Sequence, residues 1–321
     1  MSDGGTESHT HDATGTEWSR RPVESRRRWL AVARKDFADA GRSWQLYVLT
    51  AVFTVAMSFG AASPVLSSMA RDRATPVYSA TDGLVRMAEF TEFIVPLVVL
   101  MLGHMAIAGQ SERGSLRTLL ALPVSRRDVV LGTVVGRTAV VGTALAVGLS
   151  VSGVLMWVFY DGFGVLTYVG FSASILAFAA CFVAMAVGIS AASPTRGHAL
   201  TWAVSAFGVT TFLWGIFLFL VKVASDVTVV VYNSEPNRAP GWFVFLDRAH
   251  PGTAMRHVVS NWIVPVFPGQ GIGGSSQYPR LTNPGPEPFY LDAWFLALVV
   301  LAWGLVPLAV GYWRFRDAEV V

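Results

Sequence analysis

The sequence has little charge and almost no cysteine. Of its 321 residues only 14% are charged, against roughly 25% in soluble globular chains, while 53% are hydrophobic and the mean hydropathy is +0.50. This balance excludes an ordinary soluble domain and indicates a membrane protein. Cys181 is the single cysteine, which excludes an intrachain disulfide, and its place in an apolar run is typical of a buried small hydrophobic residue.

Lysine is equally scarce, since Lys35 and Lys222 are the only two, and neither follows a glycine. A P-loop needs a Gly-Lys pair, so the chain cannot bind ATP in that way. His9 and His11 lack further ligands nearby, and we predict no metal and no cofactor in this chain. The net charge of +3 is spread over the ends of apolar runs, which favours anionic lipid headgroups over nucleic acid as the counterpart.

The amino-terminal part divides into a tail and an amphipathic helix. Residues 1–23 are polar or basic and predict a disordered tail. Residues 24–42 have helical periodicity, with apolar side chains on one side and basic side chains largely on the other. The residues that define this pattern are Trp29, Leu30, Arg34, Lys35 and Phe37. We expect an elbow helix that lies on an anionic membrane surface.

Six apolar runs follow, each about the 20 residues needed to cross roughly 30 Å of hydrocarbon. They cover residues 44–63, 90–109, 138–159, 167–188, 199–221 and 293–313. Six spans place both termini on one side, and that side carries 16 of the 24 Lys and Arg residues. The positive-inside rule therefore predicts cytoplasmic termini in the plasma membrane and an external loop over residues 222–292. The predicted fold class is an all-α integral membrane protein.

The loop at 110–137 is a charged island between two spans. Leu116, Leu119 and Leu120 lie at helical spacing, and Pro123 ends this short amphipathic segment. Ser125 and Asp128 then form an S-x-x-D signature for the start of a new helix. On spacing alone, two interpretations stay open: a docking element for another protein, or a solvated loop whose leucines rest on the headgroups.

Other features concern the membrane interior and the external side. Within the second span, Glu92 and His104 form a candidate intramembrane polar site, and a hydrogen bond from His104 to another helix is favoured over a proton relay. Gly132 and Gly136 permit close helix approach. The external loop holds nine of the 16 prolines, yet its apolar stretch 253–267 is too short to span and predicts a re-entrant or interfacial helix.

The chain resembles the permease subunits of prokaryotic type-2 ABC exporters over nearly its whole length. The resemblance is carried by Ala33-Arg34-Lys35-Asp36-Phe37, by Arg42-Ser43, by the loop from Glu112 to Arg127 and by Gly311-Tyr312-Trp313-Arg314-Phe315. It implies one permease domain over residues 24–321 with an elbow helix, a coupling helix in the 110–137 loop and short external re-entrant helices. The mechanism that it implies is rocking of two permease bundles between inward-open and outward-open states.

The resemblance also implies partners and site residues. A separate ATPase subunit, which holds the ATP and Mg²⁺, would dock on the coupling helix, and a second permease chain would complete the pathway. The docking residues would be Glu112, Arg113, Leu116, Leu119, Leu120, Pro123, Arg126 and Arg127. This chain itself would not be an enzyme.

Two other classes of function stay open from the sequence. A stand-alone six-span channel or secondary carrier would need Glu92 or His104, and its loop would touch only lipid. An intramembrane serine protease would need a Ser–His pair; Ser150 and Ser152 offer the serine, but the sixth span has no histidine and His104 precedes the serines, which makes this class the less favoured one.

Overall fold

The computed structural model describes residues 28–69, 80–109, 124–160, 163–224, 238–262, 280–281 and 288–317. Within these ranges the only strands are β1 (Arg238–Ala239) and β2 (Arg280–Leu281), which pair in parallel. All the remaining elements are helical. The helices of the bundle are α2 (Trp44–Met69), α3 (Ala80–Gly103), α6 (Arg126–Phe159), α7 (Val165–Ala192), α8 (Arg196–Gly208), α9 (Trp214–Ala224) and α12 (Ala293–Asp317). The other helical elements are α1 (Arg28–Gly41), the π-turn η2 (Val209–Leu213) between α8 and α9, α10 (Gly241–Arg248), α11 (Pro251–Trp262) and η3 (Phe289–Leu291).

Five helices of the described chain are long and apolar enough to cross a membrane: α2, α6, α7, α12 and the continuous helix formed by α8, η2 and α9. This confirms the all-α membrane class. The sixth expected crossing is α3, which has 24 residues but carries Asp82, Arg86 and Glu89 in its first half and Glu92 directly after it. Six spans therefore stay a prediction.

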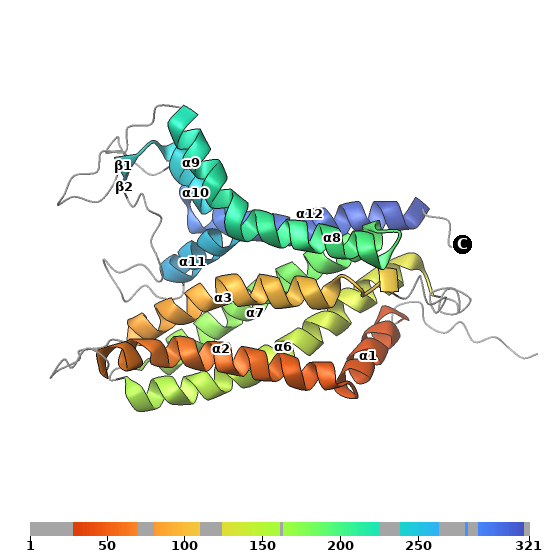
Figure 1. Ribbon diagram of the computed structural model, residues 1–321, viewed down its shortest axis with the longest axis horizontal. Coiled ribbons are helices and arrows are strands. Elements are labelled where there is room, and N and C mark those ends of the chain that lie inside the picture. The colour runs from red at the N-terminus through yellow and green to blue at the C-terminus, as the bar shows by residue number, and fades with distance from the viewer. Residues whose placement is uncertain are drawn as a thin grey trace, which may run out of the picture.

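Helix α7 is the centre of the bundle. In its most apolar 18-residue stretch 72% of the residues are buried, compared with 6% in the helix that runs through α8 and α9. Helices α3, α6 and α12 pack on α7, and α2 packs on α3 and α6. In Figure 1, α1 and the carboxyl end lie at one end of the bundle, while α10 and α11 lie at the other.

Helices α7 and α12 approach to backbone contact. A Cβ atom added at Gly304 would lie 2.7 Å from the Cys181 carbonyl oxygen, and one added at Gly311 would meet the backbone of Gly188. Small residues permit such approach between helices in a membrane, where packing contributes much of the association energy. The α7–α12 seam has no room for a side chain at these positions.

The second predicted span differs from the structure. Residues 90–109 were expected, but α3 begins at Ala80 and ends at Gly103. The early start is consistent with local pairing, because Arg86 Nη1 contacts Glu89 Oε2 at 2.9 Å along the helix. At the far end, the hydroxyl of the buried Ser190 on α7 accepts the backbone N–H groups of Ile107 (2.9 Å) and Ala108 (3.1 Å), so α7 binds the turn that ends α3.

Of three other predicted elements, one span is longer than its apolar run, and two amphipathic stretches are described only in part. Span 138–159 is the carboxyl part of α6, which starts at Arg126. The amphipathic stretch predicted at 24–42 contains α1, although residues 24–27 lie outside the described part of the chain. The apolar stretch at 253–267 is helical as far as Trp262, within α11, and its remainder lies outside the described residues.

Candidate functional site

Most of the predicted docking residues lie outside the described part of the chain. These residues are Glu112, Arg113, Leu116, Leu119, Leu120 and Pro123. The description resumes at Val124, immediately before α6. The site can therefore be built from the helices that receive the loop, beginning with the first turn of α6.

The first turn of α6 is fixed by a capping box. Ser125 Oγ accepts the backbone N–H of Asp128 at 3.2 Å, and the Asp128 carboxylate accepts the backbone N–H of Ser125 at 3.0 Å. This confirms the start predicted from the S-x-x-D spacing, and it satisfies two backbone donors that a helix start leaves open. From this cap α6 runs without a break for 34 residues.

Arg126 and Arg127 contact the end of α12. Arg126 Nη1 donates to the carbonyl oxygens of Phe315 and Arg316, the latter at 2.8 Å, and Arg127 Nε donates to the Tyr312 hydroxyl at 2.7 Å. The carbonyls at a helix carboxyl end have no partner within the helix and carry its negative dipole, so a guanidinium stabilises them. Both arginines thus join α6 to α12, and a role in docking stays a prediction.

Helix α1 packs on the next turns of α6. A Cβ atom at Gly132 would lie 2.6 Å from the Trp29 carbonyl oxygen, and one at Gly136 would lie 2.9 Å from Asp36 Cβ. The close helix approach predicted for this glycine pair is confirmed, and its partner is α1. Asp36 Oδ2 also contacts Arg137 Nε at 3.1 Å. Burial raises the pKa of Asp36, while the Arg137 guanidinium acts in the opposite direction.

The outer face of α1 carries the predicted elbow residues. Leu30, Arg34 and Phe37 follow one another at helical spacing and are exposed, and Lys35 beside them is exposed as well. Trp29 is half-buried and belongs to the side that meets α6. An exposed face with apolar and basic side chains is typical of a helix at a membrane surface. The position of α1 on a membrane stays a prediction.

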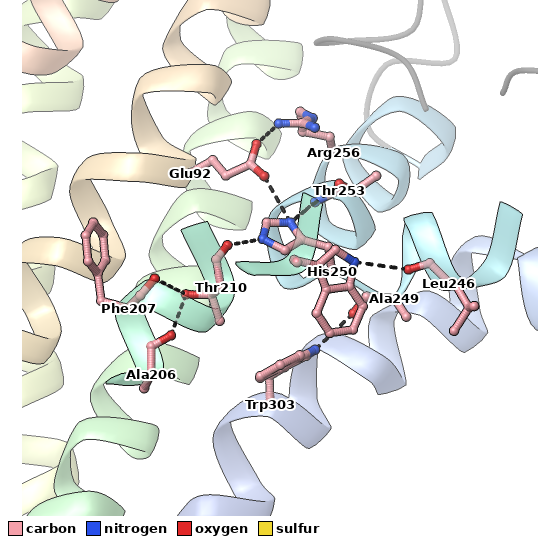
Figure 2. A network of polar contacts seen from close by, with 11 residues as sticks. Glu92, Ala206, Phe207, Thr210, Leu246, Ala249, His250, Thr253, Arg256 and Trp303 are labelled. Atoms are coloured by element: carbon pink, nitrogen blue, oxygen red, sulfur yellow. Dashed lines mark hydrogen bonds and ion pairs between the residues drawn. The ribbon is translucent and has the colours of Figure 1, made fainter. Parts of the chain in front are cut away.

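A polar network ties α3 to α11 at the opposite end of the bundle (Figure 2). Glu92 of α3 forms an ion pair with Arg256 of α11 and also contacts His250, whose Nδ1 lies 3.0 Å from Glu92 Oε1. His250 occupies the two-residue connection between α10 and α11, which we call the corner. A Cβ atom at Gly252 would overlap the Glu92 carboxyl group, so the first turn of α11 lies directly against this side chain.

The corner also binds the helix that runs from α8 to α9. That helix contains a π-turn, η2, and His250 Nε2 hydrogen bonds to the carbonyl of Thr210 within it. π-turns occur frequently at functional sites. Two indoles complete the enclosure: Trp214 Nε1 donates to Leu246 O at 3.2 Å, and Trp303 Nε1 donates to Ala249 O at 3.0 Å. Carbonyls at the end of α10 are thereby satisfied.

Burial dominates the titration of the histidines in this region. It lowers the pKa of His250, while the Thr210 carbonyl and the Asp247 carboxylate act in the opposite direction. Burial and then the Arg248 guanidinium lower the pKa of His257 to about 4, so its imidazole is neutral at physiological pH. No group of three or more metal-ligating side chains occurs among the described residues.

His104 and Glu92 do not form one site. His104 lies in the turn after α3, and its Nδ1 is 2.6 Å from the carbonyl of Met101. The predicted hydrogen bond from the His104 side chain to another helix is therefore wrong: the contact between helices is made by its carbonyl, which accepts from Ser190 Oγ at 2.7 Å. Because α3 ends at Gly103, the His104 imidazole lies in the turn and contacts a carbonyl of the preceding helical turn.

The serines considered for an intramembrane protease have structural partners. Ser150 Oγ donates to the Ala146 carbonyl at 2.7 Å, and Ser152 Oγ bonds to the Gly148 carbonyl and to the Tyr168 hydroxyl. These contacts stay within α6 and its α7 neighbour, and none of them is to His104.

The sequence analysis did not identify Ser190, which binds the turn after α3, or the residues that contact Glu92, which are Arg256 and His250.

Comparison with known proteins shows a family that matches most of the chain. The model of the ABC-2 family transporter protein matches residues 30–320. A protein of Pseudomonas aeruginosa described as probable ABC transporter permease protein NosY is 24% identical over 289 residues, which cover 89% of this chain and 97% of that protein. Its counterpart in Stutzerimonas stutzeri, described in the same words, is 26% identical over 295 residues, covering 89% and 96%.

Proposed function

Because the chain belongs to the ABC-2 family of transporter proteins, we propose that this multi-pass ABC transporter permease subunit forms half of an export pathway and is driven by a separate ATPase docked on its 110–137 loop. A second permease chain, identical or homologous, completes the pathway. ATP and Mg²⁺ are bound by the ATPase. Both termini and the loop lie on the cytoplasmic side, as the distribution of basic residues indicates.

The observation that carries this proposal is the continuity of α6. Its 34 residues extend for about 50 Å, from the capping box beside the loop to the far end of the bundle. Its first turn is bonded to α12 through Arg126 and Arg127, and the turns that follow pack on α1. A force applied to the loop therefore acts on three helices that are already joined. A loop that only rested on lipid would not need this construction.

The channel or secondary-carrier alternative finds less support. It requires Glu92 or His104 to handle a solute or an ion within the membrane. Glu92 is already engaged by Arg256 and His250, and the His104 ring contacts a carbonyl of its own turn. Both side chains thus have partners in the fold.

The test is co-purification of the ATPase with Leu119→Glu and wild-type chains at equal membrane levels. An apolar side chain buried in a partner groove contributes roughly 1.5–3 kcal/mol, and a charge there adds a desolvation cost. ATPase recovery should therefore fall about tenfold or more. The matched control is Leu166→Glu, at an 86% exposed leucine in the first turn of α7, which should leave recovery unchanged. If Leu119→Glu recovers as much ATPase as the wild-type chain, Leu119 is excluded as a docking residue.

A further inference from the structure

His250 is held between two oxygen atoms, one on each side of its ring. Nε2 bonds to the carbonyl of Thr210, and Nδ1 lies 3.0 Å from Glu92 Oε1. A carbonyl can only accept, so Nε2 must carry a hydrogen. An ionised carboxylate can also only accept, and the contact at Nδ1 therefore needs a hydrogen of its own.

A neutral imidazole has one ring proton, which is on Nε2, and a carboxylate has none. The Glu92–His250 contact therefore needs one additional proton between Nδ1 and Oε1. The proton can sit on the imidazole, as an ion pair, or on the carboxyl group, which then donates to Nδ1. Burial of His250 favours the second form, and Arg256 beside Glu92 favours the first. In either form the contact exists while the proton is present. Without it, a lone pair on nitrogen would face a lone pair on oxygen.

The surroundings offer the ring a further partner. The backbone N–H of Thr253 donates to His250 Nδ1 at 3.4 Å in the structure, the Thr253 hydroxyl lies 3.5 Å from the same nitrogen, and both stay in place once that nitrogen is bare. Glu92 then keeps Arg256, and Nε2 keeps the Thr210 carbonyl. The corner therefore keeps Thr253 and the Thr210 carbonyl in both states and contacts Glu92 through His250 only while the proton is present.

We propose that Glu92 and His250 share a proton and act as a latch, which holds the corner between α10 and α11 on α3 as long as that proton is bound. The latch joins α3, the corner and, through the Thr210 carbonyl, the π-turn. Release of the proton removes the link from His250 to α3, while the Arg256–Glu92 pair and the link to the π-turn stay in place. This inference does not depend on where the ATPase docks.

Few other groups near the corner can imitate this response. The charged side chains that face it are Arg256 on α11, Asp247 on α10, Lys222 on α9 and, through Arg256, Glu89 on α3. Carboxyl, ammonium and guanidinium groups ordinarily titrate outside the interval from pH 6 to pH 9. The pKa of His257 is about 4, so this ring stays neutral over the same interval. Among the described residues around the corner, the proton shared by Glu92 and His250 is therefore the one expected to be released between pH 6 and pH 9.

The sign follows from counting protons. A separated His and Glu, with ordinary pKa values of about 6.5 and 4.3, hold almost no proton between them above roughly pH 7.5. The joined pair holds one. The joined state therefore loses stability relative to the separated state as the pH rises above about 6.5, and the latch opens on the alkaline side.

Hydrogen–deuterium exchange of the full chain in lipid nanodiscs tests the latch. Rates are measured at pH 6.0 and pH 8.5 and corrected for the intrinsic pH dependence of exchange. In the wild type, segment 241–262 should open about tenfold more at the higher pH, because a charge-assisted hydrogen bond is lost. In Glu92→Gln the side-chain amide donates to Nδ1 without a titrating proton, so the segment should be protected equally at both pH values. His257→Gln is the matched control and should retain the wild-type response.

Two results would overturn the proposal: equal corrected exchange of the wild type at both pH values, or a pH response that survives in Glu92→Gln. If Glu92→Gln does not insert, His250→Gln replaces it and should exchange fast at both pH values. A wild-type response in that variant would equally exclude the latch. None of these measurements involves the ATPase, so their outcome is separate from that of the docking test.

Discussion

The seam between α7 and α12 allows a quantitative prediction, in which Gly304 is replaced by Ala. The added Cβ atom would lie 2.7 Å from the Cys181 carbonyl oxygen and 3.0 Å from Cys181 Cα. Both of these atoms belong to the backbone of α7, so no side chain can turn aside to make room. The helices must separate, and the neighbouring contact between Gly188 and Gly311 must loosen with them.

The expected cost is that of overpacking a well-filled core, about 1–3 kcal/mol. A second term has the opposite sign, because Ala is favoured over Gly in a helix interior by about 0.5–1 kcal/mol. The control Gly215→Ala isolates this second term, since a Cβ atom at Gly215 in α9 would have nothing within 4 Å. The two variants should therefore differ in the free energy of unfolding by about 1–3 kcal/mol, with Gly304→Ala the less stable.

The assay is unfolding in mixed detergent–SDS micelles, with the labelling rate of Cys181 by a small maleimide as a second readout. Cys181 is the only cysteine of the chain and lies on α7 at the level of Gly304. Gly304→Ala should unfold at lower SDS and label faster than the wild type, whereas Gly215→Ala should be at least as stable as the wild type. Equal stability of the two variants would refute the steric argument.

Two further predictions concern topology and the α1–α6 contact. In a Cys181→Ser background, single substitutions Ser19→Cys and Ser275→Cys should leave only position 275 open to an impermeant thiol reagent on intact cells, and labelling at 19 alone would reverse the orientation. Burial raises the pKa of Asp36 above its ordinary 3.8 despite Arg137. The free energy of unfolding of the wild type should therefore fall as the pH rises from 3.8 through the raised value, because the folded state must then ionise a buried carboxyl group. The thermal stability of Asp36→Asn relative to the wild type should therefore increase with pH over this range, and a constant difference would contradict the assignment.

The sequence predicts best where the information is local. Apolar runs locate the spans, because a helix must carry about 20 such residues to cross the hydrocarbon. The Ser125–Asp128 spacing predicts the start of α6, since both partners of a capping box lie within one turn. By contrast, Asp82, Arg86 and Glu89 make the first half of α3 look like a loop, although pairing along the helix accommodates two of them.

The corner could not be predicted from the sequence because its partners are far apart in the chain. Glu92 is singled out by its place in an apolar run, but periodicity contains no information on the guanidinium and imidazole that reach it from α11 and the corner. The π-turn at Thr210 has no composition that marks it, since it is defined by which carbonyl each N–H reaches. Likewise Gly132 and Gly136 indicate a close approach without naming α1 as the partner.

Helix α12 connects the two ends of the bundle. Its carboxyl end is bonded to the first turn of α6 by Arg126 and Arg127, and near its middle Trp303 donates to the Ala249 carbonyl at the corner. A displacement of the first turn of α6 is thus passed to α12, which runs from there past Pro307 to the corner. Since Gly304 places α12 in backbone contact with α7, the two helices must move together. Loosening this seam should therefore weaken the link between the loop end and the corner, even where both ends keep their own contacts.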